Sequence, residues 1–369
     1  MPEIMKRPRK TVPRPSGLPI PEIGNCMTRR RFLAGAGSLI LLGAAGCGRD
    51  ASGGGEQGSG DARAVEHKYG STEISGTPER VVTVGLTDQD SVLALGVKPV
   101  AVTEWYGEYG YAAWPWAREA LGDARPEVMP RNNDQLDFER LAALEPDLII
   151  GQYSGMTRDE YETASRIAPT IAQSGDYPDF GAPWQDQTLT IGHALGRRGR
   201  AEELISGVDA RFAEVSEQYP RFEGKTAVVG EFFETFFVRS ESDPRTRFLT
   251  SLGFVLPEEI ADLTGDRDGA DISEEQLRLF DRDLLLWNIG FYPQLEDELR
   301  DNEIYQQLDV AREGRDIFLS DEVLSGALTW SSVLSLPYAL DRIAPMLAAA
   351  VDGDPETEIE RAAVEEASG

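Results

Sequence analysis

The stretch "DFERLAALEPDLIIGQYSG", residues 137–155, contains the repeating unit that decides the fold. Asp137 lies where a helix N-cap is expected, because its carboxylate can accept hydrogen bonds from the free backbone N–H groups of the first turn. The apolar residues that share one face of this helix are Phe138, Leu141 and Leu144. Pro146 ends the helix, and the apolar run at 147–151 predicts a buried strand.

The same order of helix and strand returns along the chain. The run "RVVTVG" at 80–85 predicts a strand, and residues 88–105 then predict a helix and a second strand. In "ISEEQLRLFDRDLLLWNIG", residues 272–290, Ser273 is a candidate N-cap with Gln276 three residues on, and an apolar strand follows. Strands that alternate with helices pair in parallel and have both faces covered, so the sequence predicts an α/β fold.

A helical tract separates two such series. Its apolar residues recur at helical spacing as Ala201, Leu204, Ile205, Val208, Phe212 and Val215, which predicts a helix that spans about 30 Å. The expected organisation is a signal region over residues 1–47, a flexible tether over 48–64, an N-terminal α/β lobe over 65–184, a helical linker over 185–220, a C-terminal α/β lobe over 221–351 and an acidic tail over 352–369. A cleft between the lobes is the expected ligand site.

The N-terminal region has the pattern of an export signal. "RRRFLAGAGSLILLGAAGC", residues 29–47, has a basic start and an apolar run that is shorter than the roughly 20 residues that a membrane-spanning helix needs. The arginines resemble a twin-arginine signal, and "GAAGC" resembles a lipobox in which Cys47 becomes lipid-modified. Translation can start at Met1 or at Met27, and the sequence does not decide between them.

Composition restricts the chemistry of the mature domain. The formal net charge of the whole chain is −28, and the basic signal region is not part of the mature domain, so the mature domain repels nucleic acid and no nucleic-acid partner is expected. With Cys26 and Cys47 in the signal region, no cysteine remains for a disulfide or a metal site, and the histidines are His67 and His193 alone. No GxSxG, P-loop or HExxH motif is present, so we expect no enzyme, no metal and no cofactor, although carboxylate-only catalysis stays open.

Seven blocks resemble, in chain order, the iron-siderophore substrate-binding lipoproteins of ABC importers. They are "DFERLAALEPDLIIGQYSG", "YETASRIAPTIA", "IGHALGR", "RFLTSLGF", "ISEEQL", "GFYPQL" and "SSVLSLPYALDRIAPML". The resemblance covers residues 65–351 and implies two Rossmann-like lobes joined by a single long helix. It implies a monomer, anchored through Cys47 on the extracytoplasmic face of the membrane, that delivers a ferric siderophore to an importer permease. Haem or cobalamin binding, a sensor role and an enzyme acting on a siderophore conjugate are the alternatives.

The residues that follow strands are the candidates for ligand contact, because strand ends line the cleft of α/β sheets. The candidates are Trp105, Tyr106, Tyr153, Arg239, Trp287, Tyr292 and Trp330, the last in an expected loop before the final helix. For each candidate there is an alternative to ligand contact. The aromatic residues can instead pack under loops or in the core, and Trp287 is a core residue if its strand is buried. Arg239 can pair with Glu231 or Glu234 instead of contacting a ligand. Arg131 and Arg158 are further cationic candidates, for which a solvated surface position is favoured.

The resemblance also implies an acidic residue on each lobe that meets arginines of the permease. Glu139 matches the first of these, although a carboxylate there also suits a helix N-terminus. In "RFLTSLGF" the place often held by glutamate is Thr250, so the second contact passes to Glu258 or Glu259, or is missing. Such rim charges act more on association rate than on final affinity.

Overall fold

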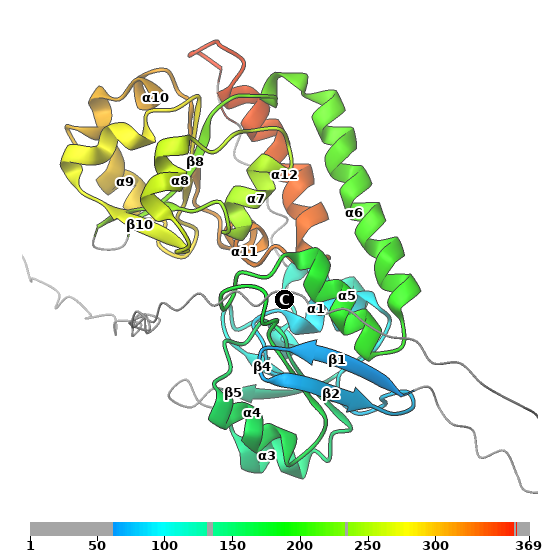
Figure 1. Ribbon diagram of the computed structural model, residues 1–369. Coiled ribbons are helices and arrows are strands. Elements are labelled where there is room, and N and C mark those ends of the chain that lie inside the picture. Colours follow the sequence, from blue (N-terminus) through cyan, green and yellow to red (C-terminus); the bar gives the residue numbers. More distant parts are fainter. Residues whose placement is uncertain (1–61, 131–135, 233–234, 358, 360–369) are drawn as a thin grey trace, which may run out of the picture. The chain divides into compact units, whose positions relative to one another are not determined.

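The computed structural model describes residues 62–130, 136–232, 235–357 and 359, which build two α/β lobes with a five-stranded sheet in each (Figure 1). A hairpin of β1 (Arg63–His67) and β2 (Gly70–Ile74) precedes the first sheet. Its inward residues Val65 and Ile74 are buried in the core of the first lobe. The first strand of the described residues therefore begins within the segment expected to be a tether.

The first sheet is entirely parallel. Its strands lie in the order β5 (Glu127–Pro130), β4 (Ala101–Glu104), β3 (Val81–Thr83), β6 (Leu148–Gly151) and β7 (Thr170–Ala172). Asp137 caps α3 (Phe138–Ala143) by accepting a hydrogen bond from the backbone N–H of Arg140 at 2.9 Å. Every residue of β6 is buried, so the helix and strand expected from residues 137–155 are confirmed.

Alternate residues of these strands point to opposite faces of the sheet, so each strand contributes to two cores. Val81 and Ile150 belong to one core, and Val82 and Ile149 belong to the other. The first core is covered by α1 (Asp88–Ala94) and α5 (Trp184–Ala194), and the second by α3 and α4 (Arg158–Ser165). Coverage on both faces is the reason that these strands read as continuous apolar runs.

The second sheet is mixed. Its strands lie in the order β10 (Gly269–Ile272), β9 (Phe236–Arg239), β8 (Ala227–Phe232), β11 (Leu284–Asn288) and β12 (Asp316–Leu319). The three strands β8, β11 and β12 are parallel, whereas β9 is antiparallel to both of its neighbours. The connection from β8 to β9 is too short for a parallel crossover, so the two strands form a hairpin.

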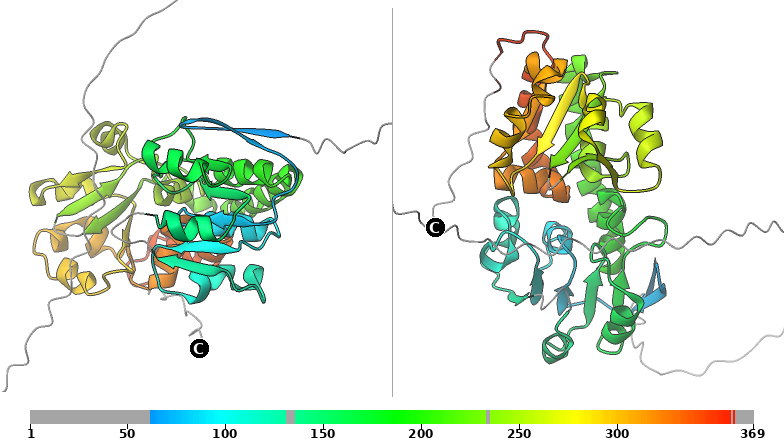
Figure 2. Two further views of the ribbon diagram at one scale, coloured as in Figure 1. Left: turned by 90° about the horizontal axis from the view of Figure 1, so that it is seen from below. Right: turned by 90° about the vertical axis from the view of Figure 1, so that its left-hand side faces the viewer.

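The second sheet is also covered on both faces, as the two views of Figure 2 show. Val229 and Leu286 belong to one core, and Val228 and Leu285 to the other. The first core includes residues of α7 (Pro244–Thr250), α11 (Glu322–Trp330) and α12 (Ser335–Ala350), and the second includes residues of α8 (Glu258–Thr264), α9 (Leu295–Arg300) and α10 (Asp309–Arg312).

The helix α6 (Arg198–Gln218) connects the lobes and is the longest in the described chain (Figure 1). Ala201 is buried in a core of the first lobe, and Val208 and Phe212 are buried in a core of the second. Leu204 packs against both. The apolar stripe of α6 is thus shared between the lobes, which makes this helix part of each core.

Short helices complete the fold. They are α2 (Arg118–Leu121) and the 3-10 helices η1 (Gly110–Ala112), η2 (Pro115–Ala117), η3 (Pro220–Phe222), η4 (Glu274–Phe280) and η5 (Tyr305–Gln307). The capping box of Ser273 and Gln276 is confirmed, and the helix it opens is η4. In the described residues, no single helix is long and apolar enough to span a membrane; α11 and α12 reach that length only as a pair bent by 119°.

One local expectation is corrected. Trp330 is the last residue of α11 and does not lie in a loop. Asp321 caps the start of α11 by accepting a hydrogen bond from the backbone N–H of Leu324 at 2.7 Å. Ser331 has a left-handed backbone with φ of 41°, which ends the helix. The cap and the left-handed residue together hold the indole of Trp330 at the C-terminal end of a buried helix.

Candidate ligand-binding site

The strand orders place a crevice at an equivalent point in each lobe. In the first sheet the chain runs outward from β3 to β5 and then adds β6 and β7 on the other side of β3. In the second sheet it runs outward from β8 to β10 and then adds β11 and β12. In each sheet the chain therefore leaves two neighbouring strands in opposite directions: β3 and β6 in the first sheet, and β8 and β11 in the second. Such switch points are where open α/β sheets bind ligands.

Tyr153 lies at the switch point of the first lobe, directly after β6. Its backbone N–H donates to Asp88 Oδ1 at 3.0 Å, and its carbonyl accepts from the N–H of Leu86 at 2.9 Å. The loops that follow β3 and β6 are thus tied together. The ring of Tyr153 meets the ring of Phe180 edge-on with centroids 5.6 Å apart, and the residue is 5% exposed.

Four rings from both lobes form what we call the aromatic cluster: Tyr106, Trp114, Phe291 and Trp330. Tyr106 and Trp330 are stacked, with centroids 5.3 Å apart. Phe291, in the loop after β11, lies 6.3 Å from Trp330 and 6.4 Å from Trp114. Trp114 packs so closely on α11 that a Cβ added at Gly326 would lie 2.7 Å from its ring. The cluster therefore joins the loop after β4 to the second lobe.

A polar network holds the second-lobe part of this cluster. Ser325 donates to Asn288 Oδ1 at 2.6 Å, and Asn288 donates to the hydroxyl of Thr329 at 2.8 Å. The N–H of Gly290 donates to Ser325 at 3.2 Å, which positions the loop that carries Phe291 against α11. The indole N–H of Trp330 is itself buried and has no hydrogen-bond partner among the described residues.

Trp105 also lies at this end of the first lobe. It donates its indole N–H to the carbonyl of Val84 at 3.2 Å. Together with Leu86, Tyr106, Trp114 and Trp330, it lines one small hollow between the loops that follow β3 and β4. Tyr153 is bonded to the same β3 loop, so the candidate residues of the first lobe share one edge of the sheet.

The second lobe contributes what we call the arginine cluster: Arg239, Arg245 and Arg247. Arg245 forms a double hydrogen bond to Asp243, from Nε to Oδ1 at 2.8 Å and from Nη2 to Oδ2 at 2.7 Å. One oxygen of Glu231 pairs with Arg245 and the other pairs with Arg239. Arg239 therefore makes the ion pair with Glu231 that the sequence left as the alternative to ligand contact; Glu234 lies outside the described residues.

Burial and opposite charge act against each other in this cluster. Burial alone would raise the pKa of the Asp243 carboxyl, but the charge and hydrogen bonds of Arg245 hold that pKa below its usual value. Burial alone would lower the pKa of Arg245, but Asp243 and Glu231 raise it. Both groups are therefore charged at neutral pH. The pKa of Arg247 is lowered, because burial outweighs its acidic neighbours.

The arginine cluster faces the first lobe at Tyr153. Burial, together with the charge of Asp243, raises the pKa of the Tyr153 hydroxyl to about 12, and the positive charges of the three arginines partly offset this rise. Arg247 donates to the carbonyl of Gly181 in the first lobe at 2.9 Å. Tyr153, Asp243 and Arg245 are all buried in this conformation, so a ligand can reach them only when the facing loops or lobes move apart.

Trp287 does not lie in the cleft, and its predicted ligand contact is corrected. It is 0% exposed within a core of the second lobe, and its indole N–H donates to the hydroxyl of Tyr305 at 2.9 Å. Its strand is covered on both faces, so neither face is open to a ligand. Tyr292, just beyond this strand, is half-buried and packs against the same core.

The sequence analysis did not predict three residues of the candidate site: Arg245, Arg247 and Phe180. The signal available was weak: Asp243 and Pro244 mark a helix start directly after β9, and arginines that follow a strand in this way can point to a cleft. What brings Arg245 of α7 to the site is its pairing with Glu231 of β8, a contact that no local pattern reveals.

The remaining candidates lie outside this region or outside the described residues. Glu139 and Glu258 are both exposed in the first turns of α3 and α8, whereas Glu259 pairs with Arg282. Arg158 lies over the ring of Tyr69, 5.0 Å from its centroid. Cys47 and Arg131 fall outside the described residues.

Neither histidine forms part of a metal site in the described residues. His67 is buried, and its ring nitrogen lies 2.9 Å from the hydroxyl of Thr72. The His193 ring lies 3.2 Å from the carbonyl oxygen of Ala64. In this part of the chain, no group of three or more histidine, cysteine, aspartate or glutamate side chains is arranged to hold a metal ion.

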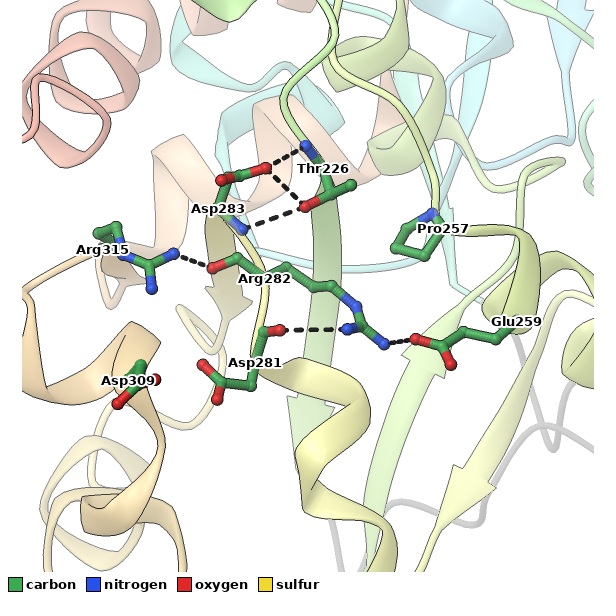
Figure 3. A pocket seen from close by; sticks show the side chains of 8 residues that line it. All are labelled: Thr226, Pro257, Glu259, Asp281, Arg282, Asp283, Asp309 and Arg315. Atoms are coloured by element: carbon green, nitrogen blue, oxygen red, sulfur yellow. Dashed lines mark hydrogen bonds and ion pairs between the residues drawn. The ribbon is translucent and has the colours of Figure 1, made fainter.

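A second hollow lies at the opposite ends of the second-lobe strands (Figure 3). Thr226, before β8, and Asp283, before β11, hydrogen-bond to each other there. Arg282 pairs with Glu259 at the rim. Because the hollow is at the N-terminal ends of the strands, it is separate from the switch points and from both clusters.

Comparison with known proteins identifies relatives along most of the chain. Residues 81–323 match the family model described as periplasmic binding protein. A putative ABC transporter substrate-binding lipoprotein of Bacillus subtilis is 25% identical over 68% of this chain and 79% of its own length. The Fe(3+)-citrate-binding protein of the same organism is 24% identical over 72% of this chain and 80% of its own.

Solved structures agree with this match. A periplasmic solute binding protein from Mycobacterium smegmatis is 36% identical, with a TM-score of 0.67, and the match covers 79% of this chain and 99% of the other. PiaA from Streptococcus pneumoniae in complex with ferrichrome is 26% identical, with a TM-score of 0.68 and the same coverage. The two-lobed α/β fold expected from the sequence is therefore confirmed.

Proposed function

The chain belongs to the periplasmic binding protein family, and from this premise we propose that it captures a ferric siderophore and delivers it to an ABC importer. Proteins of this family are transport components without enzymatic activity, so the chain is a substrate-binding protein. Which siderophore it binds depends on the residues of its own site.

The observation that carries the proposal is that both lobes bring aromatic rings to their facing edges and that the second lobe adds a cluster of arginines. Tyr106, Trp114 and Tyr153 come from the first lobe, and Phe291 and Trp330 come from the second. Arg247 of the arginine cluster donates to the carbonyl of Gly181 in the first lobe, and the neighbouring Phe180 contacts the ring of Tyr153. The contact residues we propose are Trp105, Tyr106, Tyr153, Phe291, Trp330 and the arginine cluster, with Tyr292 at the edge.

This set suits a ferric chelate better than a bare metal ion. The oxygens of a siderophore already fill the coordination sites of iron, so a binding protein needs apolar walls and hydrogen-bond donors instead of metal ligands. Aromatic faces pack against the organic part of the chelate. Guanidinium groups donate strong charge-assisted hydrogen bonds to its oxygens. The names of two relatives, an Fe(3+)-citrate-binding protein and a ferrichrome complex, support the same ligand class.

The proposal includes an anchor and a docking contact. Cys47 is proposed to carry a lipid that holds the protein on the extracytoplasmic face of the membrane, which the lipoprotein names of relatives support. Glu139 and Glu258 are proposed to meet the permease, because both are exposed carboxylates in the first turn of a helix, one on each lobe. The permease and the ferric siderophore are then the two partners of a monomeric chain.

The experiment is a titration of the purified chain with ferric and iron-free siderophores of several classes, followed by quenching of tryptophan fluorescence. Saturable quenching by a ferric chelate at submicromolar concentration, with weaker binding of its iron-free form, is the expected result. Saturable binding of haem or cobalamin, with no response to any ferric hydroxamate, catecholate or citrate, would overturn the proposal.

A further inference from the structure

Resting on the proposed function, we propose that the arginine cluster selects ferric chelates of low net charge, and that Glu231 sets this selectivity. The side chain of Glu231 is 6% exposed and lies at the end of β8, the central strand of the second sheet. It binds two arginines of the cluster at once, one with each carboxylate oxygen. Its charge therefore offsets the positive charge that the arginine cluster presents to a ligand.

The charges of the cluster almost cancel. Three guanidinium groups face two buried carboxylates, those of Glu231 and Asp243, which leaves one positive charge in excess among the described residues. Asp268 lies 3.4 Å from Arg239 and offsets this excess, although its side chain is 79% exposed and its effect is screened by water. Three arginines at a cleft thus provide little net charge for an anionic ligand.

Charge balance then discriminates among chelates. An iron(III) ion with three hydroxamate groups is neutral, whereas an iron(III) ion with three catecholate groups carries three negative charges. Bringing three uncompensated charges into a buried site costs far more than burying neutral hydrogen-bonding oxygens. The net charge of the whole chain, −28, adds long-range repulsion of polyanions.

The arginine cluster and the aromatic cluster each still offer a hydrogen-bond donor to a neutral chelate. The Nε–H of Arg239 is buried and has no partner among the described residues. The buried indole N–H of Trp330 is equally unpartnered. Hydroxamate oxygens accept such hydrogen bonds without bringing net charge. A neutral chelate therefore gains hydrogen bonds, and its desolvation on burial costs little free energy.

The test compares two probes: ferrichrome, a neutral ferric tris-hydroxamate, and ferric enterobactin, a trianionic ferric tris-catecholate. Affinities are measured by tryptophan quenching for the full chain and three variants. Glu231→Gln keeps the shape and removes one negative charge from the cluster. Asp268→Asn removes an exposed charge near Arg239 and leaves the buried network intact, so it tests the idea even if the first variant does not fold. Glu259→Gln is the matched control, because its ion pair with Arg282 lies at the opposite ends of the strands (Figure 3).

We expect the unmodified chain to bind ferrichrome at least ~100-fold more tightly than ferric enterobactin. Glu231→Gln should reduce this ratio by ~10-fold or more, Asp268→Asn by about 2- to 5-fold, and Glu259→Gln not at all. Tighter binding of ferric enterobactin by the unmodified chain, or a ratio unchanged in the first two variants, overturns the inference while the proposed function stands. If the chain binds no ferric chelate of any class, the proposed function fails and the inference fails with it.

Discussion

Tyr106 of the first lobe and Trp330 of the second are stacked across the gap between the lobes, with ring centroids 5.3 Å apart and planes inclined by 19°. Tyr106 is 43% exposed, so the stack lies where solvent and ligand can reach it. A chelate that contacts either ring must insert beside the stack or between its members. The stack is therefore both a contact between the lobes and a candidate wall of the binding site.

Replacing Tyr106 by alanine tests this wall. We expect ligand affinity to fall about tenfold, because the aromatic contact and the positioning of Trp330 are both lost. The matched control is Tyr219→Ala, since Tyr219 stacks on Phe222 with the same centroid distance of 5.3 Å but follows the last residue of α6 and belongs to neither cluster. Titration of both variants with the ferric siderophore that binds the unmodified chain gives the comparison. Equal affinities in the two variants would count against a ligand role for Tyr106.

Trp287 offers the opposite test, because the structure makes it a core residue. Trp287→Phe should lower the free energy of unfolding by about 1–3 kcal/mol, since it removes the hydrogen bond to Tyr305 and leaves unfilled volume. Affinity for the siderophore should stay within about twofold. Denaturant unfolding and ligand titration measure the two effects separately. A loss of affinity at unchanged stability would restore the ligand contact first expected from the sequence.

Asp90 of α1 predicts a pH dependence. Its Oδ2 accepts hydrogen bonds from Trp116 at 2.8 Å and from Ser332 of the second lobe at 2.5 Å, while its buried Oδ1 has no partner among the described residues. Burial raises the pKa of Asp90 to about 6, and these two hydrogen bonds only partly offset that rise. The folded state therefore binds this proton more tightly than the unfolded state does, and the free energy of unfolding falls as pH rises from about 4 to about 6.

The variant Asp90→Asn removes the titrating carboxyl group and, with it, this contribution to the pH dependence. The difference in free energy of unfolding, variant minus unmodified chain, should therefore rise by about 2–3 kcal/mol between pH 4 and pH 7. Asp88, whose pKa burial raises to about 7, acts in the same direction but is present in both proteins, so it cancels in the difference. Denaturant unfolding at a series of pH values measures the two curves. Parallel curves would show that Asp90 does not titrate as its surroundings require.

Gly326 of α11 predicts a steric limit on the contact between the lobes. A methyl group there would lie 2.7 Å from the ring of Trp114, so Gly326→Ala should destabilise the protein by about 1–2 kcal/mol and weaken ligand binding. Gly207→Ala in α6 is the control, because a Cβ there meets nothing within 4 Å. That change should stabilise by about 0.5–1 kcal/mol through helix propensity. Equal effects in thermal unfolding of the two variants would contradict close packing at Trp114.

Glu139 tests the proposed docking to the permease. Glu139→Arg should leave siderophore affinity unchanged, because the residue is exposed on α3, and should abolish siderophore uptake by cells. Glu217→Arg makes the same charge change on the exposed side of α6 and should leave uptake intact. Uptake of iron-loaded siderophore in cells that carry each variant is the measurement. Normal uptake with Glu139→Arg would remove this residue from the docking surface.

Local chemistry explains which parts of the fold were predictable. Asp137 and the paired Ser273 and Gln276 are capping signals that act within one turn, so they mark helix starts without knowledge of the rest of the chain. The fully buried strand β6 reads as an apolar run for the same local reason. The antiparallel β9 and the helix α11 were not anticipated, because their pairing and packing partners are distant in sequence.

The candidate site divides in the same way. Tyr106, Tyr153 and Trp330 could be named from the sequence because each follows a strand or precedes a final helix, and the structure brings their elements to the facing edges of the lobes. Arg245 could not be named, since only its pairing with Glu231 places it there. Trp287 was placed wrongly because a strand that is buried on both faces shows no alternation, so its pattern cannot distinguish an aromatic residue of the core from one of the cleft.

By itself, the sequence determined the α/β class, the helix caps, the buried strands and a charge that disfavours polyanionic partners, because these depend on composition and on contacts within a few residues. Only the tertiary structure decided which rings meet across the lobes and how Glu231 and Asp243 offset most of the positive charge of the arginine cluster. Such contacts join residues that are far apart in the chain. Their energies depend on burial and distance, which exist only once the strands are ordered in their sheets.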